Sequence, residues 1–378
     1  MTNTHEIIFE LLKGSITGMN CFQHFEQLSK SDWNQLYILT QQQGLVSVVI
    51  EAISSLPRQF LPPQRLRFEW IGQTLYREKI YQQQYRISCK FADALAKEGV
   101  KCLVLKGLAL ASFYPKPQLR EFGDLDCYLI ASQDSRVHLS NSLGIMFQEV
   151  FNFGNDVAKK LGGKIKDAGY KHVHIHLDGL LIENHKYLTN FNETKQGVKI
   201  EKILRQLALD GGEKRIGVTN LWIPSPEFNV IFLLKHALDD FIANDMPLRA
   251  LYDWTVFMNA EQENIDWKKM SFLLDECKLR NFFELMTETC RTYFGLNIHA
   301  DGLLITTHRK MVDDMIHDVL NKPTVNSGNL TMSRKIPNIL GRFKRQYKYR
   351  KIETESVGTL IWNTVVFSSL LRRKVSLE

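Results

Sequence analysis

The feature that most constrains the fold is a change of hydrophobic pattern part-way along the chain. Residues 65–97 keep apolar side chains at helical spacing and contain one glycine, Gly72, and no proline. This pattern predicts one long helix that stops at Gly99. From Val100 the short apolar run VKCLVLKG is typical of a buried strand. The sequence therefore predicts a helical N-terminal domain over residues 1–98, followed by a region that contains strands.

Strands and helices alternate in the next segment, residues 99–220. LALASFY predicts a helix, and LREFGDLDCYLI predicts a strand over Asp124–Ile130. A further helix is expected over Asp134–Leu143. The segment KHVHIHLDGLLIENHKYL predicts two strands joined by a turn at Asp178-Gly179. We therefore expect a small α/β core here.

A helical period returns after Pro226 and defines the third part of the chain, residues 221–378. Four helices are expected there, over Glu227–Ala243, Leu248–Ala260, Trp267–Lys278 and Phe282–Tyr293. The predicted fold class is α+β, with a small mixed-sheet core flanked by helical N- and C-terminal domains.

The formal net charge of +7 is concentrated near the C-terminus, because residues 331–351 hold eight Lys or Arg residues and no acid. The rest of the chain is close to neutral, which excludes a general polyanion binder. Phe343, Tyr347 and Tyr349 interleave with the cations. This basic tail is predicted either to bind nucleic acid by charge and stacking, or to be a solvated helix face with its aromatic rings packed inward.

The six cysteines include no CxxC pair, and the 44% hydrophobic content suits a globular protein. This cysteine usage indicates a reducing compartment without a disulfide framework. The first residues lack the basic and apolar regions of a signal peptide. The apolar stretch Leu360–Leu371 is too short to cross a bilayer. We expect a soluble, cytoplasmic protein without a membrane span.

Two carboxylates, Asp124 and Asp126, stand at positions i and i+2 of a predicted strand and therefore face the same side. Their neighbours are apolar, and unpaired carboxylates are costly in a core. Hard oxygen ligands at this spacing suit one or two Mg²⁺ ions that clamp phosphate oxygens. The alternative is an edge strand whose aspartates simply face water.

Two further positions suit phosphate and metal chemistry. Lys106 and Gly107 stand where a strand is expected to turn into a helix, and there backbone N–H groups and a lysine charge can meet a phosphate. Glu183 stands in an apolar strand with His185 two residues on, and it suits a third metal ligand or a general base toward an acceptor hydroxyl. The alternatives are an ordinary strand–helix junction and a surface glutamate.

The order of these motifs resembles one family. A KG turn, a helix, R-x-x-x-D-x-D and a later strand with E-x-H are similar to the uncharacterised nucleotidyltransferase-like family of the DNA polymerase β superfamily. The resemblance rests on VLKGLALASFYPKPQLREFGDLDCYLI, on KHVHIHLDGLLIENHKYL, and on LLKHALDDF with MPLRALYDWTVF. It covers roughly residues 30–290, and it implies that the predicted α/β core is a nucleotidyltransferase core.

The resemblance also implies roles for single residues. Asp124, Asp126 and Glu183 are expected to be catalytic and to bind Mg²⁺ or Mn²⁺ together with a nucleoside triphosphate. Many superfamily members have Gly-Ser after the first strand, whereas a leucine follows Gly107 here. Lys106 is therefore the expected substitute for holding the triphosphate.

A second set of polar residues completes the expected nucleotide-binding site: Arg120, His185, Lys235, His236, Arg249 and Asp253. Arg120 can pair with a phosphate through two hydrogen bonds or with a nearby acid such as Glu121. The residues of the helical half can grip the nucleotide or form i,i+4 pairs along their helices.

The histidine row His172, His174 and His176, with Asp178, is expected on one strand face, where it could bind Zn²⁺. HIHLD is similar to the HxHxD element of metallo-hydrolases with the metallo-β-lactamase fold, but Gly179 follows where that motif continues with His. We favour histidines that line the nucleotide or acceptor cleft.

The expected activity is the Mg²⁺-dependent transfer of a nucleoside monophosphate from an NTP, with ATP among the candidates, to an acceptor hydroxyl. The acceptor would be a small molecule, a protein or an RNA. The alternatives are a catalytically inactive nucleotide-binding regulatory module and a His-rich zinc hydrolase.

Overall fold

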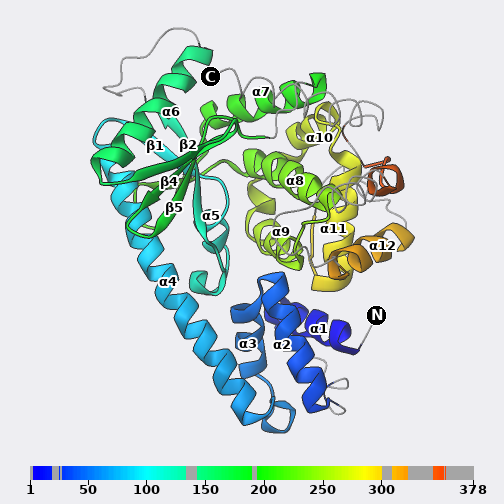
Figure 1. Cartoon of the computed structure of the whole chain (residues 1–378). Helices are drawn as coiled ribbons and strands as arrows, with labels where there is room; N and C mark the ends of the chain where they lie inside the picture. The colour runs from blue at the N-terminus through cyan, green and yellow to red at the C-terminus, as the bar shows by residue number, and fades with distance from the viewer. Residues whose placement is uncertain are drawn as a thin grey trace, which may run out of the picture.

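Helices α1 (Asn3–Thr17), α2 (Lys30–Gln43) and α3 (Val46–Ser54) open the chain. Helix α4 (Gln64–Ala96) is 33 residues long and runs from these helices to the sheet (Figure 1). The long helix predicted from the sequence is thereby confirmed. The computed structural model describes residues 3–18, 25, 28–132, 143–189, 194–299, 309–321, 344–352 and 354.

A mixed seven-stranded sheet forms the centre of the chain, in the order β3-β4-β5-β2-β1-β7-β6. Its strands are β1 (Val100–Val104), β2 (Asp124–Ala131), β3 (Lys164–Ala168), β4 (His172–Leu177), β5 (Leu180–His185), β6 (Lys214–Arg215) and β7 (Leu221–Ile223). Strand β2 is central, antiparallel to β1 and parallel to β5. The predicted α+β class is confirmed, as are the strand that begins at Asp124 and the turn at Asp178-Gly179 between β4 and β5.

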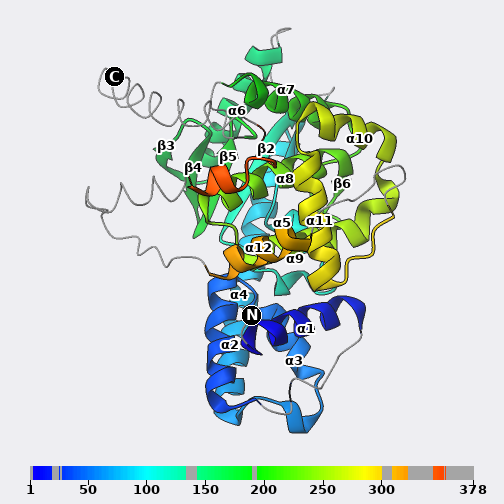
Figure 2. The same ribbon diagram turned by 90° about the vertical axis from the view of Figure 1, so that its right-hand side faces the viewer.

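Helices cover both faces of the sheet (Figure 2). The helices within and after the sheet are α5 (Leu108–Ala111), α6 (Leu143–Lys160), α7 (Lys195–Leu209), α8 (Pro226–Ala243), α9 (Leu248–Glu261), α10 (Trp267–Glu276), α11 (Arg280–Phe294) and α12 (Arg309–Leu320). The four helices predicted after Pro226 are confirmed as α8 to α11.

The alternation of side chains along β2 decides which way the carboxylate pair faces. Leu125 and Leu129 pack into the core that α4 and α6 share with the sheet. Tyr128 belongs to the other core, which contains α7, α8 and α9. Asp124 and Asp126 lie on the Tyr128 face, so they point toward the C-terminal helices.

The N-terminal helices pack against the C-terminal ones, and one hydrophobic core joins them. In α1, the ring of Phe9 lies 4.7 Å from that of Tyr293 and 5.7 Å from that of Phe294, both in α11. Helix α4 contributes Trp70 to this core and Phe91 to the core beneath the sheet. The division of the chain into three domains stays a prediction.

Some elements differ from expectation. LALASFY forms only the single turn α5 before Pro115. The helix expected over Asp134–Leu143 lies almost wholly outside the described residues, which resume with α6 at Leu143. The sheet continues past residue 220 through β7, which pairs with β1. Three residues are too short a run to reveal a strand in the sequence.

Part of the basic tail lies among the described residues. Tyr349 is buried, with its ring 4.7 Å from that of Phe241, and Arg345 stacks over Phe241. Tyr347 is exposed. One aromatic ring therefore packs inward and one faces solvent. Nucleic-acid binding by residues 331–351 stays a prediction, and Phe343 lies outside the described residues.

Five of the six cysteines lie in the described part of the chain, and each of these five is a free thiol. None of the helices that the structure describes combines the length and the apolar character that crossing a bilayer requires.

Candidate functional site

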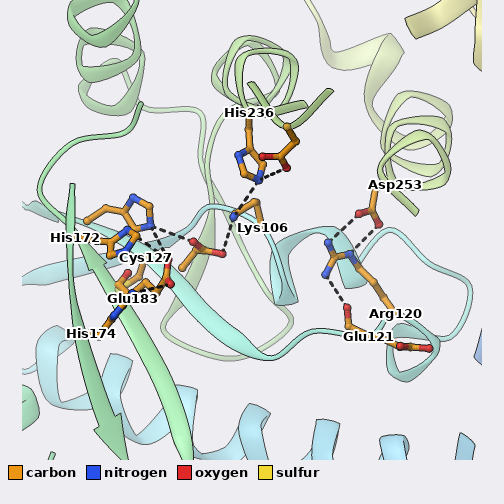
Figure 3. A network of polar contacts seen from close by, with 12 residues as sticks. Lys106, Arg120, Glu121, Cys127, His172, His174, Glu183, His236 and Asp253 are labelled. Carbon is orange, nitrogen blue, oxygen red and sulfur yellow. Dashed lines mark hydrogen bonds and ion pairs between the residues drawn. The ribbon is translucent and has the colours of Figure 1, made fainter. Parts of the chain in front are cut away.

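A cavity of about 500 Å³ opens between the sheet and helices α8 and α9. This volume is within the range typical of small-molecule sites. The predicted site residues that line the cavity are Lys106, Gly107, Arg120, Asp124, Asp126, His236, Arg249 and Asp253. Glu183, His185 and Lys235 are not among its lining residues. Figure 3 shows the polar contacts around Lys106, Arg120 and Glu183.

Asp126 is a buried carboxylate held on both sides. Its Oδ2 lies 3.1 Å from Nζ of Lys106, and its Oδ1 lies 3.0 Å from Nε2 of His185. Burial alone would raise the pKa of Asp126, but the Lys106 ammonium and the His185 hydrogen bond hold it well below its usual range. Burial likewise opposes the charge of Lys106, yet the carboxylates of Asp126 and Asp124 raise its pKa. This pair is therefore fully ionised.

The pKa of Asp124 is shifted in the opposite direction from that of Asp126, although both residues stand on the same face of β2. Burial and the neighbouring Asp126 carboxylate raise the pKa of Asp124 to about 6. Its side chain makes no hydrogen bond or ion pair with any residue that the structure describes. A carboxylate without a partner, at the wall of a cavity and beside a second carboxylate, is stabilised by a cation. These two oxygen donors fit a hard divalent ion such as Mg²⁺.

Gly107 allows the chain to turn sharply into the cavity after β1. Its φ is +44°, a conformation that side chains rarely adopt. A Cβ atom at this position would lie 3.3 Å from the carbonyl oxygen of Asp124 and 3.7 Å from Cβ of Phe122. The backbone of the turn therefore lies directly against the start of β2. This close approach places Lys106 beside Asp126.

Arg120 is buried and forms a two-pronged ion pair with Asp253 of α9. Its Nε lies 2.8 Å from Oδ1 and its Nη2 lies 2.9 Å from Oδ2. The hydroxyl of Tyr114 donates to the same carboxylate at 2.6 Å. The predicted alternative, a salt bridge to an acid, is confirmed for Arg120, but the acid is Asp253 and not Glu121. Arg120 and Asp253 thus join the loop before β2 to the C-terminal helices.

Glu121 links the cavity to the N-terminal helices. Its carboxylate pairs with Arg77 of α4 and accepts a hydrogen bond from the backbone N–H of Val46 at 3.1 Å. Arg249 donates to the backbone carbonyl of Glu121 at 3.0 Å. Arg77 and Glu121 also line the cavity, and sequence reasoning missed them as site residues. No local signal marks Arg77, which is one of many polar residues along a 33-residue helix.

His236 of α8 faces Lys106 across the cavity. Its Nε2 lies 3.3 Å from Nζ of Lys106 and 3.4 Å from Oδ2 of Asp240. Burial, with the charge of Lys106, holds the pKa of His236 well below its usual range, so the ring is neutral. Burial also raises the pKa of Asp240 to about 6. Lys235 pairs with Asp239 along the helix instead.

The residues of the predicted histidine row have different surroundings in the structure. His172 and His174 lie 3.4 and 3.1 Å from the two oxygens of Glu183. His176 is exposed and lies opposite Leu181. Asp178 lies in the turn and pairs with Lys90 at 3.0 Å. The three histidines of the row and Asp178 are therefore not brought together at one metal position.

Sheet register explains why Glu183 reaches the carboxylate pair. Glu183 of β5 lies opposite both His174 of β4 and Asp126 of β2. These three residues form one row across three strands, on the face that looks toward the C-terminal helices. His172 lies opposite His185 in the next row. Glu183 and His185 therefore stand behind the cavity, Glu183 beside Asp126 in the sheet and His185 in contact with its carboxylate.

Two carboxylates and several cationic side chains meet at one cavity, an arrangement that can bind a divalent ion and phosphate oxygens. The sequence profile of the uncharacterised nucleotidyltransferase family matches residues 29–295. The chain belongs to this family, which confirms the resemblance seen in the sequence. Searches of curated proteins and of solved structures each find no match.

Proposed function

We propose that the protein is a Mg²⁺-dependent nucleotidyltransferase that uses an NTP as donor. An acceptor hydroxyl oxygen attacks the α-phosphorus, the bond from that phosphorus to the α,β-bridging oxygen breaks, and pyrophosphate leaves. The hydroxyl proton passes to a base or to solvent. The observation that carries the proposal is the convergence of Asp124, Asp126 and Lys106 at one cavity of about 500 Å³, in a chain of a nucleotidyltransferase family.

Asp124 and Asp126 are the residues that would hold Mg²⁺ or Mn²⁺, since both are hard oxygen donors on one strand face. A bound divalent ion supplies charge that neutralises phosphate oxygens during the displacement. Of the two carboxylates, Asp124 is the one without a hydrogen-bond or ion-pair partner among the described residues, so an ion would change its electrostatics more. Its raised pKa of about 6 supports this role.

Cations around the cavity would bind the triphosphate. Lys106 lies between the carboxylate pair and His236, and a phosphate oxygen can replace His236 as its partner. Arg249 lines the same cavity and donates to a backbone carbonyl, which leaves guanidinium N–H groups for phosphate oxygens. The ion pair of Arg120 and Asp253 orients the loop before Asp124 rather than gripping substrate. Most of the catalysis would come from positioning and electrostatics.

Glu183 is the third carboxylate of the predicted catalytic set. It lies opposite Asp126 in the sheet, and histidines contact both of its oxygens. From this position it supports the proposal by orienting Asp126 through His185, and it is a candidate general base for the acceptor hydroxyl. The acceptor itself is proposed only by class, as a hydroxyl on a small molecule, a protein or an RNA.

The test measures binding and turnover separately. Melting temperature is recorded with ATP, GTP, CTP and UTP, each with and without Mg²⁺, because a ligand that binds the native state raises it. Pyrophosphate release is then measured with the bound nucleotide and a panel of acceptors. We expect a Mg²⁺-dependent shift that Asp124→Asn abolishes. Asp156→Asn is the matched control, since Asp156 is exposed on α6 and pairs only locally with Lys159. An equal loss in both variants would contradict the proposal.

A second candidate, a nucleotide-binding regulatory module without transfer activity, is favoured by one contact. The ammonium of Lys106 lies 3.1 Å from Asp126, so a fixed cation already compensates one of the two carboxylates. Nucleotide binding that is independent of Mg²⁺, without pyrophosphate release in any acceptor mixture, would support this candidate. Mg²⁺-dependent release would exclude it.

A further inference from the structure

A second polar cluster lies behind the carboxylate pair, on strands β4 and β5. His172, Glu183 and His185 each bring one ligand atom within 4.8 Å of the other two. Nδ1 of His172 lies 3.4 Å from Oε2 of Glu183, and Nε2 of His185 lies 3.7 Å from the same oxygen. Figure 3 shows His172 beside Glu183. The three residues do not line the cavity, so a nucleotide bound there does not contact them directly.

The spacing of these atoms suits a metal better than direct hydrogen bonds. Hydrogen bonds between nitrogen and oxygen are about 2.7–3.2 Å long, and both separations from Oε2 are longer. In a tetrahedral zinc site with bonds of about 2.0–2.1 Å, neighbouring ligand atoms lie about 3.3 Å apart. The observed 3.4 and 3.7 Å are close to that value.

His185 is oriented as a metal-binding histidine. Its Nδ1 lies 3.2 Å from the backbone carbonyl of Tyr187. Nδ1 thus faces a carbonyl oxygen, and Nε2 points toward two carboxylates, 3.0 Å from Oδ1 of Asp126 and 3.7 Å from Oε2 of Glu183. A metal ion bound by Nε2 and Oε2 would replace the hydrogen that Nε2 shares with Asp126, and its positive charge would lie between the two carboxylates. Metal-binding histidines commonly donate their other N–H to a backbone carbonyl in this way.

His172 supplies an independent indication. Its Nδ1 is buried and has no hydrogen-bond partner among the described residues. A buried polar atom that lacks a partner is destabilising, and a metal bond would satisfy it. His174 contacts the other oxygen of Glu183 at 3.1 Å. That contact fixes the carboxylate so that Oε2 faces His172 and His185.

We propose that His172, Glu183 and His185 bind one divalent transition-metal ion, with zinc as the best match. Two imidazole nitrogens and one carboxylate favour such ions over Mg²⁺. Three protein ligands leave a position for an oxygen of water or substrate. Asp126 borders both sites, with Oδ1 toward His185 and Oδ2 toward Lys106. The zinc site shares only His172 with the predicted row of His172, His174, His176 and Asp178, and it does not depend on nucleotide transfer.

The test is a metal titration of the full chain without nucleotide. The protein is stripped with a chelator at a pH above 7, where histidines bind metals well, and titrated with Co²⁺, followed by its visible absorption, in excess Mg²⁺. Zn²⁺ is then added as competitor. We expect one Co²⁺ per chain, displaced by Zn²⁺. His172→Asn should weaken the affinity by at least about 100-fold, and His185→Asn should do the same.

His176→Asn is the matched control, since His176 lies on the same strand but is exposed, and its Co²⁺ affinity should equal that of the wild type. Equal affinities for His172→Asn and His176→Asn, or no Co²⁺ uptake by the wild type, would overturn the zinc site. Circular dichroism checks that each variant is folded. Asp124→Asn separates the two proposals, because it should retain Co²⁺ binding while it loses Mg²⁺-dependent nucleotide binding. If nucleotide binding fails in the wild type and Co²⁺ binding persists, only the proposed function is wrong.

Discussion

Asp124 and Asp126 lie two residues apart on one face of β2, yet their pKa values are shifted in opposite directions. Burial and its neighbour raise the pKa of Asp124 to about 6, whereas Lys106 and His185 hold that of Asp126 well below its usual range despite burial. Asp124 is thus a destabilising charge that an ion would relieve, and Asp126 is a stabilising one. Such a division of roles is common where two carboxylates share a site.

The first prediction is that removing these two charges changes stability in opposite directions. Asp126→Asn leaves Lys106 without its ion-pair partner and should lower the free energy of unfolding by about 3 kcal/mol. Asp124→Asn removes a charge that the fold disfavours and should raise it by about 1–2 kcal/mol at pH 7. Urea unfolding of the two variants and the wild type measures both effects. Equal losses of stability would contradict the assignment.

The second prediction concerns pH. The folded pKa of Asp124, about 6, lies above its ordinary value of 3.8. Between the two pKa values the folded protein keeps Asp124 protonated, whereas the unfolded chain has lost that proton. The destabilisation by Asp124 is therefore absent below about pH 4 and complete above about pH 6. The stability difference between Asp124→Asn and the wild type should shrink as the pH falls through this window. Urea unfolding at a series of pH values measures it, and a constant difference would disprove the shift.

Metal-dependent nucleotide binding should follow the same titration, as the third prediction. Because Mg²⁺ needs the ionised carboxylate, affinity should fall about tenfold per pH unit below about pH 6. Isothermal titration calorimetry from pH 5 to 8 provides the measurement. Asp240 also has a pKa of about 6. The same measurement on Asp240→Asn removes its contribution, so that the remaining pH dependence reports on Asp124. A nucleotide affinity that does not change with pH in the wild type or in Asp240→Asn would refute the prediction.

The fourth prediction tests the turn at Gly107. Gly107→Ala introduces a Cβ at a φ of +44° and at 3.3 Å from the Asp124 carbonyl oxygen. We expect a loss of about 1–2 kcal/mol of stability and at least a tenfold loss of nucleotide affinity. Gly72→Ala is the control, because Gly72 lies within α4 with open space around it. That substitution should stabilise the protein by about 0.5–1 kcal/mol.

The fifth prediction concerns the ion pair between Arg120 and Asp253. Arg120→Lys keeps the charge but cannot make the two-pronged contact. The buried Asp253 carboxylate would lose a donor, and the free energy of unfolding should fall by about 2 kcal/mol or more. Urea unfolding of Arg120→Lys, Asp253→Asn and the double variant gives the coupling energy. If the two substitutions lower the free energy of unfolding additively, the coupling energy between Arg120 and Asp253 is zero and the prediction is wrong.

Local patterns were enough to predict much of the fold. The hydrophobic period of residues 65–97 predicted α4 to within a residue or two, and the spacing of Asp124 and Asp126 predicted that they share a face. Both follow from backbone geometry, because a helix repeats every 3.6 residues and a strand every two. The strand β7 was not predicted, because three residues are too few to show a period of two.

The contacts of the candidate site depend on residues far apart in the chain. Arg120 and Asp253 are 133 residues apart, and nothing near either residue marks the other as its partner. Arg77 and Asp240 line the cavity but lie on helices whose other residues are also polar or charged at many positions. Their role became visible only when the helices were packed around the cavity.

By itself, the sequence determined which residues form helices and strands and which side chains share a face, because these depend on the backbone period and on neighbouring residues. Only the tertiary structure decided that Glu183 lies opposite Asp126 and that His172 and His185 meet while His176 stays exposed. Strand register and helix packing set these distances through contacts between distant segments, and no local pattern encodes them.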